Sequence, residues 1–287
     1  MTRISVKSYA KINLGLDVTG ILPNGYHTLR MIMQTITLSD SLFFEKRTDP
    51  KIILKTNLPF LPVNEKNIVY QAIKLFKETQ RISGGMYCTV TKRIPVAAGM
   101  AGGSGNAAAT LKAMDALYNT NLSLEKLCEM GVKLGADVPY CLMEKTALAS
   151  GIGDVLEPLP APPKAKILIV KPMVSVSTKD VYSRLILDEN TVHPDIDSCV
   201  AAIREGDLKK LCANLGNVLE NVTITLHPVI ADIKKKMLSL GADGSLMSGS
   251  GPSVFGLFSD ETKAEAAFKH FSSTGEYAHN TFLCDFT

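Results

Sequence analysis

A glycine-rich segment around residue 100 is the part of the sequence best suited to binding an anion. It consists of Pro95, Val96, Ala97, Ala98, Gly99, Met100, Ala101, Gly102, Gly103, Ser104 and Gly105. Glycines let a backbone approach a ligand closely, and the helix expected over 106–118 presents unpaired N–H groups at its positive end. The segment therefore predicts a phosphate cradle, with a flexible strand-to-helix connection as the alternative. Its spacing fits neither a Walker A loop nor the G-x-G-x-x-G fingerprint.

Four further clusters carry side chains that could do chemistry, and each also has an ordinary structural explanation. Lys11 interrupts an apolar strand, where it could extend to solvent. Asp137 lies in the sequence Gly-Ala-Asp-Val-Pro, a turn where aspartate commonly bonds the local backbone. Tyr26 and His27 follow a turn and could stack in a core. The glycine-serine segment 248–253 could be a linker.

Composition and charge exclude several classes of protein. The chain of 287 residues is 46% hydrophobic and 21% charged, which is typical of a globular protein and not of a disordered or collagen-like one. Its net charge is +3 and it contains no long run of like charges, so we expect no nucleic-acid partner. The longest uncharged stretch, 94–111, is interrupted by glycines and a proline, so we expect no membrane partner either.

The cysteines and the N-terminal sequence indicate the cellular compartment in which the chain is expected to work. The 6 cysteines are widely spaced and form no zinc-ligand pattern, which indicates small buried thiols in a reducing environment. Strand-like sequence begins at the N-terminus with no apolar or arginine-rich leader before it. We therefore expect the chain to work in a cytoplasm.

Hydrophobic periodicity predicts an α+β protein, since strand and helix patterns alternate along the chain. The expected strands are 12–18, 28–38, 41–46, 51–55, 86–90, 166–171, 254–258 and a last one at the C-terminus. The expected helices are one near 69–76 behind the cap Asn64, then 106–118, a helix from 124 ended by Gly135, one near 230–240 and one near 262–271. The proline-rich stretch 157–163 breaks all periodicity and is the best candidate for a domain boundary.

Taken in order, the five clusters resemble the GHMP small-molecule kinases. The matching elements are Lys-Ile-Asn-Leu, Asn-Gly-Tyr-His, Ile-Pro-x-x-x-Gly-x-x-Gly-Gly-Ser, Gly-Ala-Asp-Val-Pro and Ser-Gly-Ser-Gly-Pro, which together extend from Ala10 to Pro252. The element Gly25-Tyr26-His27 resembles one branch of the family, which serves the non-mevalonate route to isoprenoid precursors. Homoserine, mevalonate and galactose kinases share the glycine-rich loops without that element.

The resemblance implies a two-lobed GHMP kinase fold. Residues 1–160 would form a ribosomal-S5-like N-terminal lobe that binds ATP, and residues 161–287 a ferredoxin-like C-terminal lobe. The segment Pro95–Gly105 would wrap the ATP phosphates. The reaction implied is ATP-dependent phosphorylation of the 2-hydroxyl of a small substrate linked to cytidine diphosphate.

The resemblance also implies roles for individual side chains. Asp137 would be the general base that accepts the hydroxyl proton, with Lys11 as its partner. A neighbouring lysine keeps a carboxylate ionised and can steady the phosphoryl charge. Tyr26, His27 and Tyr182 would hold the cytidine, and Asn13 would add an amide near the diphosphate or the sugar alcohol.

A few points stay open at this stage. Mg²⁺ is required to neutralise the triphosphate, and Ser104 is the one candidate ligand that the loop offers. Gly105 stands where related kinases usually carry a second serine. A glycine at a helix start with negative φ would accept serine at little cost. The alternatives are a homoserine- or mevalonate-type kinase and a non-catalytic nucleotide-binding module, and the oligomeric state is undetermined.

Overall fold

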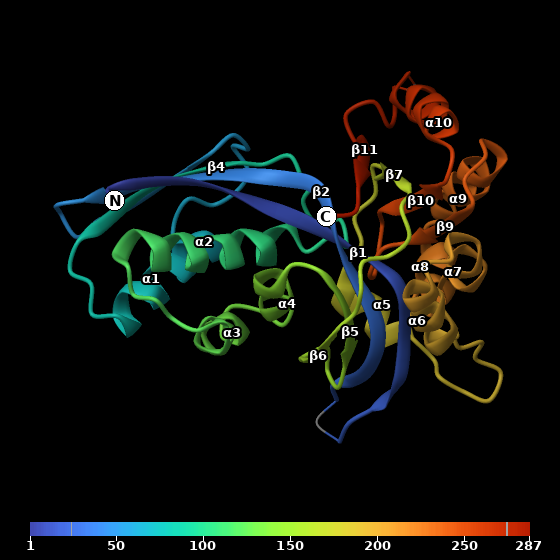
Figure 1. Cartoon of the computed structure of the whole chain (residues 1–287), viewed down its shortest axis with the longest axis horizontal. Helices are drawn as coiled ribbons and strands as arrows, with labels where there is room; N and C mark the ends of the chain where they lie inside the picture. Colours follow the sequence, from blue (N-terminus) through green and yellow to red (C-terminus); the bar gives the residue numbers. More distant parts are fainter. Residues whose placement is uncertain (24, 274) are drawn as a thin grey trace. The chain divides into compact units, whose positions relative to one another are not determined.

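The computed structural model describes residues 1–23, 25–273 and 275–287 (Figure 1). The chain packs into two compact units, each assembled from several stretches of sequence. Unit 1 comprises Met1–Ala10, Leu38–Val96 and Ala101–Glu144, and unit 2 comprises Lys11–Thr37, Ala97–Met100 and Lys145–Thr287. The long strands β1 (Arg3–Ile21) and β2 (His27–Arg47) contribute residues to both units.

Unit 1 combines strands with a group of helices. The C-terminal half of β2 pairs antiparallel with β4 (Gly85–Thr91), and β3 (Ile52–Thr56) pairs parallel with β4. The helices are α1 (Ile68–Thr79), α2 (Gly102–Tyr118), α3 (Leu124–Val132) and α4 (Val138–Met143). Figure 1 shows α1 and α2 along one face of these strands. The helices bury apolar residues at helical spacing, as Val69, Ala72, Ile73 and Phe76 do on α1.

Unit 2 contains a four-stranded antiparallel sheet in the order β11-β7-β10-β9. These strands are β7 (Lys166–Val170), β9 (Gly244–Met247), β10 (Val254–Phe258) and β11 (Thr281–Asp285). Every residue of β10 is buried, which explains its unbroken apolar sequence. Helices α9 (Val229–Ser239) and α10 (Glu261–Ser273) contact this sheet.

Unit 2 also contains strands and helices outside this four-stranded sheet. Strand β5 (Thr146–Ser150) pairs with Met31–Gln34 of β2 and with β6 (Val155–Pro158), and β8 (Gly216–Asn217) pairs parallel with β1. The remaining helices are α5 (Thr178–Arg184), α6 (Ile196–Glu205), α7 (Leu208–Asn214) and α8 (Glu220–Leu226).

The α+β prediction is confirmed, and several expected boundaries are wrong, among them the strand expected over 12–18, which is β1 and extends from Arg3 to Ile21. The expected strands 28–38 and 41–46 are one strand, β2, because the carboxylate of Asp40 is buried and fully bonded inside it instead of marking a turn. The cap of α1 is Asn67, whose side chain accepts from the N–H of Val69, and not Asn64. Helix α2 begins at Gly102, so the last glycines of the loop lie within its first turn.

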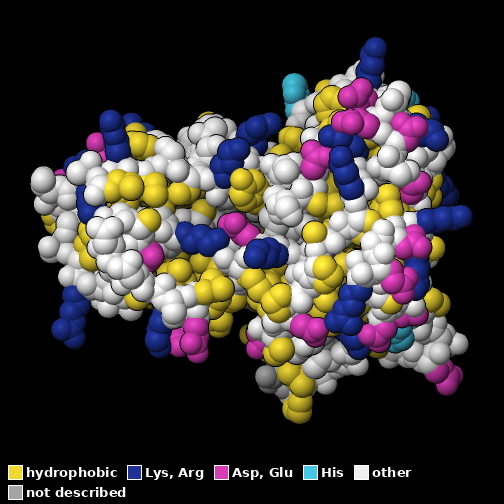
Figure 2. Space-filling view, viewed as in Figure 1, with side chains coloured by type: hydrophobic (Ala, Val, Ile, Leu, Met, Phe, Trp, Pro, Cys, Tyr) yellow, Lys and Arg dark blue, Asp and Glu magenta, His cyan; other side chains and the backbone are white. Residues whose placement is uncertain are grey.

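Neither disulfides nor a membrane helix contribute to the part of the chain that the structure describes. None of the 6 cysteines, all of them in the described ranges, forms a disulfide, and burial raises the pKa of Cys199 and Cys212 to about 12. In the described ranges, no helix is both long and apolar enough to cross a bilayer. On the face in Figure 2, basic and acidic side chains of the described residues are interspersed.

Candidate active site

The start of α2 lies in unit 1 and presents uncapped main-chain N–H groups. Ala101 adopts a left-handed conformation at φ 53°, and no described side chain caps the helix. The N–H groups of the first helical turn have no partner within a helix, and here they lie at the positive end of a 17-residue helix. This geometry suits a phosphate, as the sequence predicts.

Two of the glycines at this helix start are required by close packing. A Cβ at Gly102 would lie 2.9 Å from Cγ2 of Ile94. A Cβ at Gly105 would lie 2.8 Å from Oγ of Ser8 and 3.0 Å from the carbonyl oxygen of Tyr9. Gly105 is therefore a buried packing position, and the expectation that serine fits there at little cost is wrong. Glycine at 105 lets the helix lie directly against the backbone of β1.

Asp137 immediately precedes α4 and is half-buried. Its carboxylate makes no capping bond to α4 in the described structure, so the usual local role of a turn aspartate does not apply. The turn is closed by main-chain bonds instead, from Val138 N to Gly135 O at 3.1 Å and from Cys141 N to Asp137 O at 3.0 Å. A Cβ at Gly135 would lie 3.8 Å from Oγ of Ser104, so the Ser104 hydroxyl is adjacent to this turn.

In unit 2, Lys11 and Asn13 form a buried polar pair on β1. The Lys11 ammonium donates to Oδ1 of Asn13 at 2.8 Å, and the two side chains are 6% and 0% exposed. The amide of Asn13 donates to the sulfur of Met31 at 3.4 Å. Lys11 therefore does not extend to solvent, and its side-chain nitrogen is held by the neutral amide of Asn13.

The middle of the glycine-rich segment packs on the glycine-serine loop of unit 2. Gly99 has φ +71°, and a Cβ there would lie 2.2 Å from the carbonyl oxygen of Ser248. Oγ of Ser248 donates to the carbonyl of Gly99 at 3.0 Å, and Lys11 N donates to Met100 O at 3.2 Å. A Cβ at Gly249 would come within 3.7 Å of Oδ1 of Asn13. The two loops and the Lys11–Asn13 pair are thus brought together.

The predicted cytidine-binding residues also lie in unit 2. The rings of His27 and Tyr182 are 4.9 Å apart at an interplanar angle of 50°. Tyr26 is 61% exposed. Tyr182 lies on α5, which is linked to the glycine-serine loop by a 2.8 Å hydrogen bond between Thr178 and Ser250. Asn24, the first residue of the Asn-Gly-Tyr-His element, lies outside the described residues.

The sequence interpretation missed Asn217, which holds the glycine-serine loop in place. Its amide donates to the carbonyls of Met247 at 2.9 Å and Gly249 at 2.8 Å, and its own oxygen accepts from Leu219 N. A single asparagine outside any motif gives no signal in the sequence, whereas its 6% exposure and three bonds identify it here.

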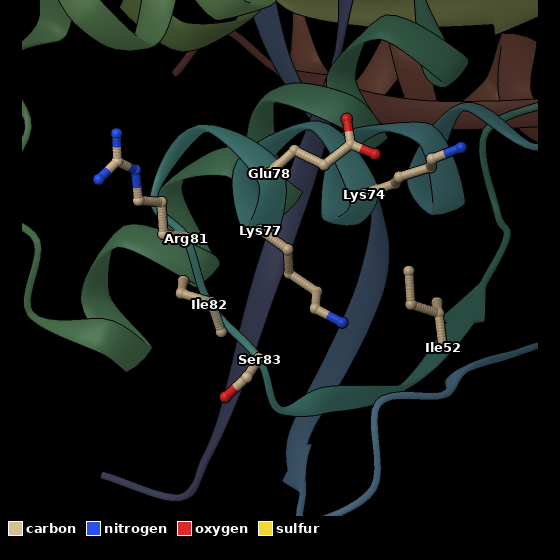
Figure 3. Close-up of a pocket in the computed structure, with 7 residues that line it drawn as sticks. All are labelled: Ile52, Lys74, Lys77, Glu78, Arg81, Ile82 and Ser83. Carbon is tan, nitrogen blue, oxygen red and sulfur yellow. The ribbon is translucent and has the colours of Figure 1, made fainter.

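Unit 1 also contains a cavity of about 360 Å³ (Figure 3). Its lining comes from β3, α1 and the segment after α1, and includes Lys74, Lys77 and Arg81. None of the predicted site residues lines it. The Lys77 ammonium donates to the carbonyl of Pro50 at 3.2 Å, so it contributes to joining α1 to the segment before β3.

Comparison with protein families identifies the class of protein. Residues 67–145 match the model of the GHMP kinases N terminal domain, and residues 199–276 match that of the GHMP kinases C terminal domain. A homoserine kinase from Cytophaga hutchinsonii has the same fold, with a TM-score of 0.78 at 22% identity over 99% of this chain and 94% of that one. The predicted GHMP kinase fold is therefore confirmed.

Two relatives define the family more closely. A protein of Lachnoclostridium phytofermentans named 4-diphosphocytidyl-2-C-methyl-D-erythritol kinase is 59% identical over 286 residues, which are 100% of this chain and 98% of the relative. The crystal structure of a 4-(cytidine 5'-diphospho)-2C-methyl-D-erythritol kinase matches with a TM-score of 0.83 at 30% identity, over 99% of both chains. This chain belongs to the GHMP kinases, and within them to the family of 4-diphosphocytidyl-2-C-methyl-D-erythritol kinases.

Proposed function

We propose that this chain transfers the γ-phosphoryl group of ATP to the 2-hydroxyl of 4-diphosphocytidyl-2-C-methyl-D-erythritol, in the non-mevalonate route to isoprenoid precursors. The observation that carries the proposal is the full-length identity of 59% to a relative with that name. The assembly of Lys11, Asn13 and the two glycine loops supports it. The similarity to homoserine kinase at 22% identity concerns the fold alone.

In this proposal the phosphates of ATP bind to the backbone of the segment 95–105. The N–H groups at the start of α2 donate to the phosphate oxygens, and the helix dipole favours their charge. Phosphoryl transfer proceeds through a loose transition state, so most of the acceleration comes from positioning and electrostatic stabilisation.

Asp137 accepts the proton of the attacking 2-hydroxyl. Its carboxylate suits a base because it is half-buried and forms no capping bond in the described structure. Lys11 acts as its cationic partner and stabilises the charge of the phosphoryl group during transfer. Asn13 fixes the Lys11 ammonium through the 2.8 Å bond and offers its amide to the diphosphate or the erythritol.

Cytidine recognition rests on the aromatic residues of unit 2. Tyr26 and Tyr182 stack on the base, and His27 makes polar contacts with the pyrimidine edge. The tilted His27–Tyr182 pair supports this assignment, since it places two of the three side chains next to each other, with ring centroids 4.9 Å apart.

Magnesium accompanies the nucleotide in this proposal. No group of three or more His, Cys, Asp or Glu side chains that could hold a metal occurs among the described residues. The Ser104 hydroxyl beside the Gly135 turn fits an ion held mainly by phosphates and water, which is the usual binding mode of Mg²⁺. Ser104 would hold the ion when ATP is bound, and the ion would neutralise triphosphate charge.

The division into lobes at residues 160 and 161 and the cytoplasmic location remain parts of this proposal. The two family models match one on each side of that division. No nucleic-acid or membrane partner is proposed, and both ligands are small polar molecules.

The requirement for cytidine provides a direct test of the proposed substrate. The kcat/KM for 4-diphosphocytidyl-2-C-methyl-D-erythritol is compared with that for 2-C-methyl-D-erythritol 4-phosphate, which presents the same hydroxyl without the base. We expect the cytidine substrate to be preferred by about 100-fold or more, the scale that stacking and hydrogen bonds to one base supply. Equal efficiencies would contradict a cytidine pocket.

A further inference from the structure

The carboxylate of Asp40, on β2 in unit 1, lies at the centre of a buried polar network. Asp40 is 0% exposed. One oxygen, Oδ1, accepts from the main-chain N–H of Arg93 at 2.7 Å and of Ile94 at 2.8 Å. The other, Oδ2, forms an ion pair with the Lys92 ammonium and accepts from the Asn106 amide at 2.8 Å. All of these donors lie in two short stretches of the chain, residues 92–94 and Asn106.

These segments are the two ends of the glycine-rich loop. Arg93 and Ile94 lead directly into Pro95, where the loop begins, and Asn106 lies in α2 just after the loop ends. The Lys92 ammonium joins the two ends a second time. It donates to Oδ1 of Asn106 at 3.0 Å and approaches the carbonyl of Gly102 at 3.4 Å.

The first turn of α2 also packs tightly against this network. The Asn106 amide donates to Oγ of Ser8 at 3.0 Å, and Gly102 has no room for a side chain against Ile94. Asn106 is 3% exposed, and the Lys92 side chain is 6% exposed. Since the interior has a low dielectric constant, a buried network with all its groups paired holds its members rigidly.

We propose that Asp40 is a positioning residue for the phosphate loop. By bonding both ends of the loop, it sets the direction of the N–H groups at the start of α2 before the nucleotide arrives. This inference rests on the proposed binding of ATP phosphates by that loop. Preorganisation improves affinity because the loop loses less conformational entropy on binding.

The test compares Asp40→Asn with Asp115→Asn. Asparagine keeps the shape of Asp40, but it removes the charge that pairs with Lys92 and turns an N–H₂ group toward other donors. Asp115 is a matched control near the opposite end of α2, where its carboxylate accepts from Thr120 Oγ1 at 2.6 Å and from Leu122 N at 2.9 Å. In both variants a carboxylate that accepts from a main-chain N–H loses its charge. Only Asp40 bonds residues at the ends of the phosphate loop.

The expected result has two readouts. In Asp40→Asn the KM for ATP rises by about tenfold or more while the KM of the phosphoryl acceptor stays within about twofold. The amide hydrogens of Arg93 and Ile94 exchange about tenfold faster or more in the nucleotide-free variant, because their acceptor is weakened. Asp115→Asn changes neither quantity beyond about twofold.

Several results would overturn the inference. An unchanged KM for ATP would do so even if amide exchange accelerated, and so would equal rises in both KM values, which indicate a general loss of structure.

If Asp40→Asn does not fold, Asn106→Ala takes its place, because it keeps the Asp40–Lys92 pair and removes the bridge to α2. A KM for ATP within about twofold of the parent in that variant would also contradict positioning. The exchange measurement needs no ATP, so a parent protein inactive with ATP would refute the proposed function separately.

Discussion

Asp137 carries the proton-transfer step of the proposed reaction. Main-chain bonds close its turn, and in the described structure its carboxylate makes no capping bond to the helix that follows. Substitution by asparagine preserves the shape of the side chain and removes its ability to accept a proton.

We expect Asp137→Asn to lower turnover by at least ~10²-fold and to change the KM of either substrate by only a few fold. Steady-state kinetics of both substrates measure this. The control is Asp207→Asn, because Asp207 also precedes a helix but caps α7 by accepting from Lys210 N at 2.9 Å. Asparagine caps as well as aspartate, so this variant should retain parental activity. Turnover within about tenfold of the parent in Asp137→Asn would remove Asp137 from this role.

Lys11→Met tests the cationic partner. Methionine keeps the aliphatic stem and loses the charge and the donor to Asn13, so we expect turnover to fall by at least ~10²-fold while the protein remains folded. Turnover and thermal unfolding are measured together. Lys171→Met is the control, since Lys171 is a half-buried lysine whose pKa is lowered by burial and whose ammonium bonds the carbonyl of Pro172. Parental turnover in a folded Lys11→Met protein would disprove the role.

Tyr182→Ala tests the cytidine pocket. Loss of a ring that stacks on the base should weaken the cytidine substrate by ~1–3 kcal/mol and leave the KM for ATP unchanged. Titration with the cytidine substrate measures the affinity. Tyr277→Ala is the matched control, because Tyr277 is also in unit 2 and contacts a ring, that of Phe271 at 5.8 Å. Equal losses in the two variants would indicate a packing effect and contradict stacking.

At the scale of elements, a contact within unit 2 restricts which residues are tolerated at position 99. Residues Ala97–Met100 of the glycine-rich segment pack there against the glycine-serine loop. Gly99 combines a positive φ with a 2.2 Å approach of its missing Cβ to the Ser248 carbonyl oxygen. Any side chain must displace the backbone of the glycine-serine loop, which Asn217 holds by two bonds.

We expect Gly99→Ala to raise the KM for ATP by about tenfold or more, because the shifted loop no longer presents its backbone to the phosphates. Gly206→Ala is the matched control, because Gly206 also has a positive φ (+68°) but a Cβ there meets nothing within 4 Å, and it lies after α6, outside the proposed binding segments. The KM for ATP is measured for both variants, and we expect it to stay within about twofold of the parent in Gly206→Ala. A KM for ATP that is unchanged in Gly99→Ala, or that rises equally in both variants, would contradict this account.

The elements also show what the sequence can and cannot predict. Strand β10 and helix α9 were predictable because an apolar run and a helical period lie between clear turn signals. The continuity of β2 through Asp40 was not, since a polar residue in a strand resembles a turn until its buried partners are known. The start of α2 at Gly102 was missed for a similar reason, because glycine has a low helix propensity and here is favoured by packing.

At the scale of the whole molecule, the order of the motifs predicted the enzyme family. The long-range contacts that hold the loops in place could not be predicted. The five clusters are separated by up to about a hundred residues, and their order alone indicated the GHMP kinases, which the family models confirm. Asn217 and Asp40 form hydrogen bonds with residues distant in the chain, so no local sequence pattern predicts their contacts. Gly105 illustrates the same limit, because its neighbours Ser8 and Tyr9 are known only from the fold.

The most direct test of the proposed function is the rate of ADP formation by the whole chain with three acceptors, each at several concentrations with Mg²⁺ and ATP. The acceptors are 4-diphosphocytidyl-2-C-methyl-D-erythritol, homoserine and mevalonate. We expect kcat/KM for the cytidine substrate to exceed the other two by about 100-fold or more, since only it fills a cytidine pocket. A comparable or higher kcat/KM for homoserine or mevalonate would contradict the proposed function.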